Sequence, residues 1–282
     1  MPGSQTSLAL QFAPTGTLRL GVWMVPYFAR TQGGGTGGII PDLGAELAHR
    51  IGVKLDLVKF EHPARMIAAF HDGSLDVTFV GITADRAEAM DFGPVVIDIQ
   101  TSYLVPPSSK IASIAEVDRP GVRIAVPAKS AQEAHLTRTI TAAALIPTPA
   151  ADPQRAIDML KAGEADAFSH VAPMLAAAQG GLPGARILPG SYFNVPIAIA
   201  VAKGRPPAVA DFARTFTEDV KRSGFVQQTI DRADVKGVLV ATYRCCQPAR
   251  RHARSRSRYQ STGRLKSASG IRSSWLTRIA SP

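Results

Sequence analysis

The sequence has 282 residues, 45% of them hydrophobic, so it can bury one large core or two modest ones. Its formal net charge of +10 comes from one end. Residues 242–282 contain ten Lys or Arg and no acid, which leaves 22 of the 32 basic side chains to balance 22 acidic ones in residues 1–241. Both cysteines, Cys245 and Cys246, lie in the same tail, which excludes a disulfide, a cysteine metal site and a cysteine nucleophile from residues 1–241.

Residues 1–16 are expected to form an N-terminal extension. The first basic residue is Arg19, and the only apolar stretch before it is short, so the basic and hydrophobic parts of a secretory signal peptide are not visible. No apolar run approaches the roughly 18 residues that crossing a bilayer requires. Either the start of the sequence is truncated or misplaced, or the protein stays in the cytoplasm.

Residues 17–23, TLRLGVW, are predicted to form the first strand, which brings Trp23 and Tyr27 toward the carboxyl edge of a sheet. Residues 33–38 contain the spacing G-x-G-x-x-G, but they follow the strand by about ten residues and do not form a tight strand-to-helix turn, so a dinucleotide site is not expected. Asp42 is expected to cap the next helix. The histidines are scattered, without the spacing of metal ligands.

Residues 76–93 form the most informative segment. Val77 to Val80 read as a buried strand, and Thr83 is expected to cap a short helix from Asp85 to Met90. Arg86 therefore follows the carboxyl end of a strand, where open α/β sheets bind ligands, and its guanidinium suits a carboxylate. The alternative is a solvated Arg86 that pairs with a neighbouring acid.

The sequence also repeats itself. Residues 68–79 align with residues 158–169, matching Asp76 to Asp166, and residues 18–22 parallel residues 122–126. Two similar α/β units predict two lobes, with lobe 1 formed by 17–104 and 197–241 and lobe 2 by 105–196. Extended segments around Tyr103 and Ile199 are expected to form a two-strand hinge, with the ligand site between the lobes.

The residues GITADRAEAMDF, from Gly81 to Phe92, resemble the segment G-x-T-x(n)-R-x(4)-D-F of the family 3 bacterial extracellular solute-binding proteins, the receptors of polar amino-acid ABC importers. The resemblance covers residues 17 to about 235. It implies a two-lobed type II periplasmic-binding-protein fold of the α/β class, each lobe an open, mostly parallel sheet with flanking helices. By position, Arg86 would hold the carboxylate of the ligand, beside Gly81 and Thr83.

The same resemblance assigns other site residues. Trp23 or Tyr27 would stack on the ligand, although these rings are equally suited to sealing the local core. Ser130 and Glu133 have the spacing of a capping box, and the backbone N–H groups of Ser130 and Ala131 would bind the ligand carboxylate from lobe 2. The alternative is that Ser130 is only a structural cap.

One departure from the family affects the ligand. Where members that bind α-amino acids carry an aspartate for the ammonium, this chain has His170, followed by Val171 and Ala172. An unpaired ammonium there would cost about 1–3 kcal/mol or more. We therefore expect a small carboxylate-bearing ligand other than an ordinary α-amino acid, with His170 as a polar contact or merely a surface residue.

The resemblance implies a periplasmic, monomeric receptor that delivers its ligand to an ABC transporter permease, with no catalytic residue, metal or cofactor. The alternative is an enzyme of the cyclohexadienyl (prephenate/arogenate) dehydratase type, for which His170 and Asp42 are the candidate general acids or bases. Nucleic-acid binding through the tail is not expected, because Tyr259 and Trp275 alone do not make a stacking platform.

The basic tail, residues 242–282, has no helical or strand periodicity and is expected to be disordered and dispensable. A chain truncated after Ala241 should keep its melting temperature and its ligand response within error in a thermal-shift assay. A clear loss of either would show that the tail docks on the body.

Overall fold

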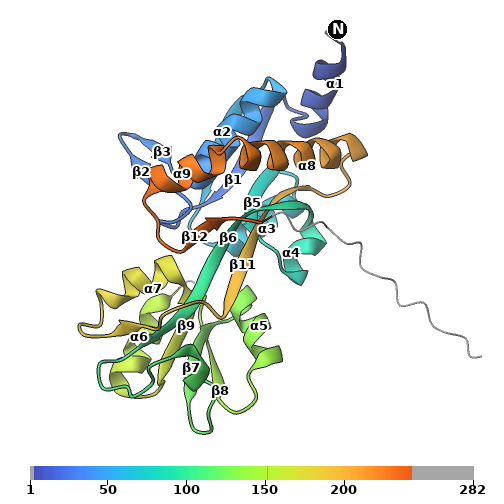
Figure 1. Cartoon of the computed structure of the whole chain (residues 1–282). Coiled ribbons are helices and arrows are strands. Elements are labelled where there is room, and N and C mark those ends of the chain that lie inside the picture. The colour runs from blue at the N-terminus through green and yellow to red at the C-terminus, as the bar shows by residue number, and fades with distance from the viewer. Residues whose placement is uncertain (1–2, 151, 243–282) are drawn as a thin grey trace, which may run out of the picture. The chain divides into compact units, whose positions relative to one another are not determined.

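The computed structural model describes residues 3–150 and 152–242 (Figure 1), which belong to one compact unit. The prediction for the tail therefore lies outside the described residues, apart from Thr242. Within the described part of the chain, no helix is long and apolar enough to cross a membrane. The predicted α/β class is confirmed: helices flank one large sheet whose strands follow the order β4-β1-β5-β11-β6-β9-β7-β8, with β10 and β12 also paired to β6.

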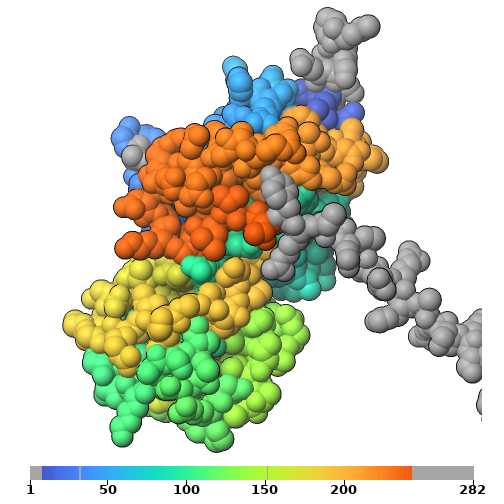
Figure 2. Space-filling view, in the orientation of Figure 1, coloured from blue at the N-terminus to red at the C-terminus, as the bar shows by residue number. Residues whose placement is uncertain are grey.

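Lobe 1 comprises the strands on the β4 side of this order and the helices around them. Its elements are α1 (Gly3–Phe12), β1 (Thr17–Trp23), β2 (Arg30–Gln32), β3 (Gly35–Gly37), α2 (Ile39–Ile51), β4 (Lys54–Phe60), α3 (Pro63–His71), β5 (Val77–Gly81), α4 (Ala84–Ala89), α8 (Pro207–Arg222), α9 (Phe225–Ala233) and β12 (Val238–Val240). In the space-filling view, α8 and α9 (orange) cover the near face of this lobe (Figure 2).

Lobe 2 comprises the strands on the β8 side. Its elements are the 3-10 turn η1 (Ile114–Glu116), β7 (Arg123–Pro127), α5 (Ala131–Thr139), β8 (Ala144–Thr148), α6 (Pro153–Ala162), β9 (Ala167–Val171), α7 (Ala172–Gln179) and β10 (Arg186–Ile187). Most buried side chains of this lobe form two hydrophobic clusters of their own, whereas Val171 at the end of β9 belongs to the main cluster of lobe 1. The exact lobe boundaries given in the sequence analysis remain a prediction.

The two segments that join the lobes are the long strands β6 (Met90–Val105) and β11 (Phe193–Ala202), which pair antiparallel with each other. Strand β6 pairs with β12 around Ile99 and with β9 around Tyr103, so the sheet continues from one lobe into the other. The segments predicted as crossovers are these two strands, and Figure 1 shows both running from lobe to lobe.

The internal repeat has a structural counterpart. Strand β1 lies between β4 and β5 and pairs parallel with both, and β7 lies in the same way between β8 and β9. Asp76 accepts hydrogen bonds from the backbone and guanidinium of Arg19, and Asp166 accepts the same set from Arg123. Each lobe thus ties the first residues of its central strand, β1 or β7, to the residue before a neighbouring strand, β5 or β9.

Two expectations for the N-terminal part need revision. Phe12 and Ala13, at the end of the predicted extension, are buried in the main core of lobe 1, and Phe12 packs edge-on against Phe212 of α8. Asp42 does not cap its helix, because α2 begins three residues earlier, after Gly38. A Cβ at Gly38 would lie 2.6 Å from the Phe28 carbonyl oxygen, so the chain can turn there only without a side chain. Asp42 instead pairs with Arg232.

Candidate functional site

A cavity of about 650 Å³ has walls from both lobes and from the connecting strands β6 and β11. This volume is in the range that small-molecule sites occupy. All eight residues that were selected from the sequence line it, from four separate parts of the chain: Trp23, Tyr27, Gly81, Thr83, Arg86, Ser130, Ala131 and His170. Most of the remaining wall is apolar, including Ile99 of β6 and Ile197 of β11.

Arg86 is the half-buried cation of this cavity. It lies in the first turns of α4, directly after β5, and its Nη1 donates to the Gly81 carbonyl oxygen at 2.7 Å. Burial lowers the pKa of the guanidinium, but a group with so high an ordinary pKa stays charged at neutral pH. Within the described residues Arg86 forms no ion pair, so the alternative of a pair with Asp85 or Glu88 is not what the structure has.

The turn before Arg86 depends on Gly81 and Thr83. A Cβ at Gly81 would lie 3.2 Å from Arg86 Nη1 and 3.3 Å from Val195, so a side chain there would crowd the guanidinium. Thr83 is the residue before α4, but the prediction that its hydroxyl caps the helix is wrong. Its carbonyl oxygen accepts from the Ala87 N–H instead, which leaves the hydroxyl on the cavity wall.

Aromatic side chains form the wall next to Arg86. Tyr27 is only 5% exposed, and its ring lies 4.7 Å from that of Phe28, which in turn packs edge-on against Trp23. Burial raises the pKa of Tyr27, and the nearby Arg86 offsets this only in part, so the phenol stays protonated. Its hydroxyl makes no hydrogen bond within the described part of the chain. These rings both seal the lobe 1 core and face the cavity.

The lobe 2 wall opposite Arg86 contains the start of α5. The Ser130 hydroxyl accepts from the Glu133 N–H at 3.0 Å, so the predicted cap is confirmed. The Glu133 carboxylate reaches the N–H of Lys129 rather than that of Ser130. Ala131 and Gln132, the first helical residues, line the cavity, and the unpaired N–H groups at such a helix start favour an anion.

His170 lies at the end of β9 and is 8% exposed. Its Nδ1 accepts from the Val171 N–H at 2.8 Å, and burial lowers the pKa of the ring to about 4. It is therefore a neutral group on the cavity wall at pH 7, and not the surface residue that the sequence analysis allowed as an alternative. Val171, the residue that follows it, is also part of the wall.

The sequence model of the bacterial extracellular solute-binding proteins, family 3, matches residues 18–233, about three quarters of the chain. The chain belongs to this family. No match was found among curated protein sequences. In the family, the ordinary arrangement is a two-lobed receptor, and the type II periplasmic-binding-protein fold predicted from the sequence is confirmed.

Solved structures similar to this family member include proteins described as binding amino acids. The lysine complex of a putative ABC transporter binding component from Wolinella succinogenes is 22% identical, with 77% of this chain and 95% of that chain covered and a TM-score of 0.62. The solute receptor for L-cysteine of Neisseria gonorrhoeae is 21% identical, with 83% and 98% covered and a TM-score of 0.62. An ancestral amino-acid-binding protein described as a precursor of cyclohexadienyl dehydratase is 22% identical, with 80% and 98% covered and a TM-score of 0.62. At these identities the likeness establishes the fold alone.

The structure of this solute-binding protein adds residues to the cavity that the sequence analysis did not select. Gln132 is 5% exposed and lies one residue beyond the predicted pair, so the capping box that located Ser130 could have included it. Asp85 and Glu88 flank Arg86 on α4 and are exposed at the wall. Val195 comes from the connecting strand β11, and no motif marks it.

Burial of neutral His170 predicts a pH dependence of stability. Its folded pKa, about 4, lies below the ordinary value of 6.5, so between these values the unfolded chain binds a proton that the native ring does not. The free energy of unfolding should therefore fall as the pH drops from 6.5 toward 4, by at most roughly 3 kcal/mol from this group. Burial also lowers the pKa of His135, which acts in the same direction.

Urea unfolding at pH 7.0, 5.5 and 4.5 would measure this effect. The His170→Gln variant should lose less stability on acidification than the parent, while His49→Gln, the same change at an exposed position of α2, should follow the parent. Equal pH slopes for the parent and His170→Gln would contradict the account.

Proposed function

We propose that this chain is a solute-binding receptor that closes its two lobes over a small carboxylate-bearing ligand and delivers it to an ABC importer. The observation that carries the proposal is the position of Arg86, a half-buried cation without an ion pair among the described residues, on a cavity with walls from both lobes. A cation held this way, with one guanidinium nitrogen donating to the Gly81 carbonyl oxygen, supports bidentate recognition of a carboxylate.

The surroundings of Arg86 also favour an anion. The Tyr27 hydroxyl, the Nε2 of His170 and the first N–H groups of α5 add donors from both lobes. Apolar side chains make up most of the wall around them, and a low local dielectric strengthens such contacts. Trp23 provides a ring face for an apolar or planar part of the ligand.

Delivery to a permease, a periplasmic location and a monomeric state are part of the same proposal. They are supported by family membership and by the similar structure from Wolinella succinogenes that is described as a putative binding component of an ABC transporter. The arrangement calls for no cofactor and no metal, because donor side chains alone suffice to bind a carboxylate.

A ligand screen tests the proposed function. Carboxylates, amino acids and prephenate-like compounds would be compared by thermal shift, with methyl esters of the hits as controls that lack the anionic group. A receptor for carboxylates should be stabilised by at least one free acid and not by its ester, since binding to the native state alone raises the melting temperature. If the ester stabilises the protein as much as the free acid does, the protein does not recognise the carboxylate group, and that part of the proposal is wrong.

Closure gives a second test. Ligand can shift a two-lobed protein toward a closed form only through contacts that differ between the two forms, and here both lobes contribute donors to the cavity. Small-angle scattering at saturating ligand should therefore give a smaller radius of gyration than without ligand. An unchanged scattering profile at saturation would show that the protein does not close on its ligand.

A dehydratase on the same scaffold is the second candidate function, suggested by the description of one similar structure as a precursor of cyclohexadienyl dehydratase. The proposed acids and bases weigh against it. Asp42 pairs with Arg232 and is not among the lining residues, and His170 has a pKa of about 4 with one ring nitrogen already occupied. Incubation with prephenate and detection of an aromatic product would establish the enzyme.

A further inference from the structure

His170 has a fixed hydrogen-bonding character. Because its Nδ1 accepts the Val171 N–H at 2.8 Å, the ring proton must be on Nε2. Within the described residues Nε2 makes no hydrogen bond, although the side chain is 8% exposed and lines the cavity. The protein therefore presents one buried N–H donor that has no acceptor of its own.

The Nε2 of His170 cannot change from a hydrogen-bond donor to an acceptor for a different ligand. If Nε2 were to accept a hydrogen bond, the proton would move to Nδ1 and face the Val171 N–H, which would place two donors 2.8 Å apart. Protonation would create the same clash, and burial already lowers the pKa of the ring to about 4. An ammonium at this position would thus meet an N–H group that repels it, and Nε2–H would stay unpaired.

The other polar groups of the wall do not replace the missing acceptor. Tyr27 and Gln132, both about 95% buried, make no side-chain hydrogen bonds within the described residues, and each can donate or accept. They are neutral. The carboxylates that line the cavity, Asp85 and Glu88, are exposed on α4 and beside Arg86, so solvent and that cation weaken their attraction for an ammonium.

We infer that the ligand carries, besides the carboxylate that binds Arg86, a second hydrogen-bond acceptor where it meets His170, and no ammonium there. Carboxylates with an oxo group and dicarboxylates share this chemistry. The inference rests on the proposed function, because it assumes that the cavity binds a carboxylate, and it goes further by naming the group at the other end.

Matched pairs of ligands test the inference by calorimetry. Succinate and L-aspartate differ only by an ammonium, and 2-oxoglutarate and L-glutamate, or 4-methyl-2-oxopentanoate and L-leucine, differ by an oxo group in place of the ammonium. The amine-free member of at least one pair should bind tenfold or more tightly, since a neutral donor left unpaired costs about one factor of ten. A preference in the two oxo pairs would indicate a carboxylate with an oxo group, and a preference in the succinate pair would indicate a dicarboxylate. L-Lysine and L-arginine test whether Asp85 and Glu88 capture a cation instead.

Variants at His170 connect the preference to this side chain. His170→Gln keeps an N–H donor at nearly the same place and should retain most of the affinity, whereas His170→Leu removes the donor and should lose about tenfold for the amine-free ligand. His170→Asp should reverse the preference within a pair. His49→Gln, an exposed position of α2, controls for loss of a histidine as such, and the melting temperature of each unliganded variant shows whether it folds.

The outcomes separate the inference from the proposed function. If the amino acid of each pair, or L-lysine or L-arginine, binds more tightly than the amine-free acids, the inference is wrong while a carboxylate receptor remains. It is also wrong if His170→Leu binds the amine-free ligand as tightly as His170→Gln does. If the protein binds no member of the panel, and no other carboxylate, the proposed function itself is overturned.

Discussion

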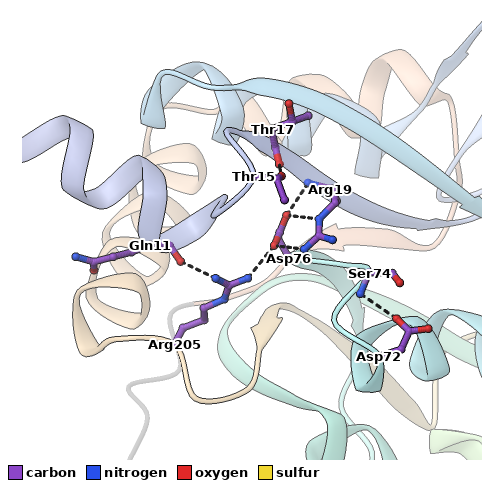
Figure 3. Close-up of polar contacts among 8 residues, drawn as sticks. All are labelled: Gln11, Thr15, Thr17, Arg19, Asp72, Ser74, Asp76 and Arg205. Carbon is purple, nitrogen blue, oxygen red and sulfur yellow. Dashed lines mark hydrogen bonds and ion pairs between the residues drawn. The ribbon is translucent and has the colours of Figure 1, made fainter.

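Replacing Asp76 with alanine should lower the free energy of unfolding by about 3–5 kcal/mol, the largest loss that we expect from a single change outside the apolar core. The Asp76 side chain is fully buried and accepts from Arg19 at 2.8 and 3.0 Å and from Arg205 at 2.7 Å. Figure 3 shows Arg205 also reaching the Gln11 carbonyl oxygen. Removing the carboxylate would leave two largely buried guanidinium groups without a counter-charge.

The internal repeat supplies the matched control. Asp166 makes the same bonds to Arg123, but the two side chains are 36% and 41% exposed, and no second arginine among the described residues joins them. Burial opposes ionisation of Asp166, yet the hydrogen bonds from Arg123 still hold its pKa below the ordinary value. Water replaces much of what this pair loses, so Asp166→Ala should cost only about 1 kcal/mol. Equal losses for Asp76→Ala and Asp166→Ala in urea unfolding would contradict this account.

Arg205 explains why the two copies differ. It lies between β11 and α8, so its bonds to Asp76 and to the Gln11 carbonyl tie the returning part of the chain and helix α1 to the start of lobe 1. Lobe 2 has no returning segment of this kind to anchor. Arg205→Ala should therefore destabilise the protein less than Asp76→Ala, because Asp76 would keep its pair with Arg19.

The repeat and the arginine of the cavity could be found in the sequence because both depend on local spacing. Asp76 and Asp166 each follow a helix and a glycine at the same interval, and Arg86 follows a strand and a turn. Periodicity and turn residues report such features directly. The partner of each aspartate could not be found this way, because Arg19 lies 57 residues from Asp76 and only the parallel pairing of β1 with β5 brings them together.

The hydrogen-bonding character of the cavity wall could be determined only from the positions of its atoms. The sequence predicts that His170 lies at the ligand site, but only the contact with the Val171 N–H shows which ring nitrogen carries the proton. Asp42 illustrates the opposite case. It is a good capping residue close to a helix start, but the cap position is at Gly38, four residues earlier, where a side chain would clash with the Phe28 carbonyl oxygen. A close backbone approach of this kind leaves no periodic signal in the sequence.

Arg86→Ala should weaken ligand binding by about ten- to hundredfold, because a charge-assisted hydrogen-bonded pair contributes about 1.5–3 kcal/mol. Arg86→Lys should weaken it nearly as much, since lysine restores the charge without the planar fork that binds a carboxylate through two hydrogen bonds. The bond between Arg86 Nη1 and the Gly81 carbonyl fixes the direction of that fork, and an ammonium cannot reproduce both contacts. Calorimetric titration with the tightest free acid of the ligand screen measures these losses.

The melting temperature of the unliganded Arg86→Ala protein should scarcely change. Arg86 has no ion pair among the described residues, so no attraction to a carboxylate offsets the desolvation cost of its partial burial, and the side chain stabilises the fold little. Lys129→Ala is the matched control: it removes an exposed cation from the other wall of the same cavity and should alter the affinity by much less than tenfold. If the Arg86→Ala protein binds the ligand as tightly as the parent does, Arg86 is not the residue that binds the ligand carboxylate. A variant that is unfolded without ligand would show instead that Arg86 is a structural residue, since a group that only waits for ligand leaves the empty protein intact.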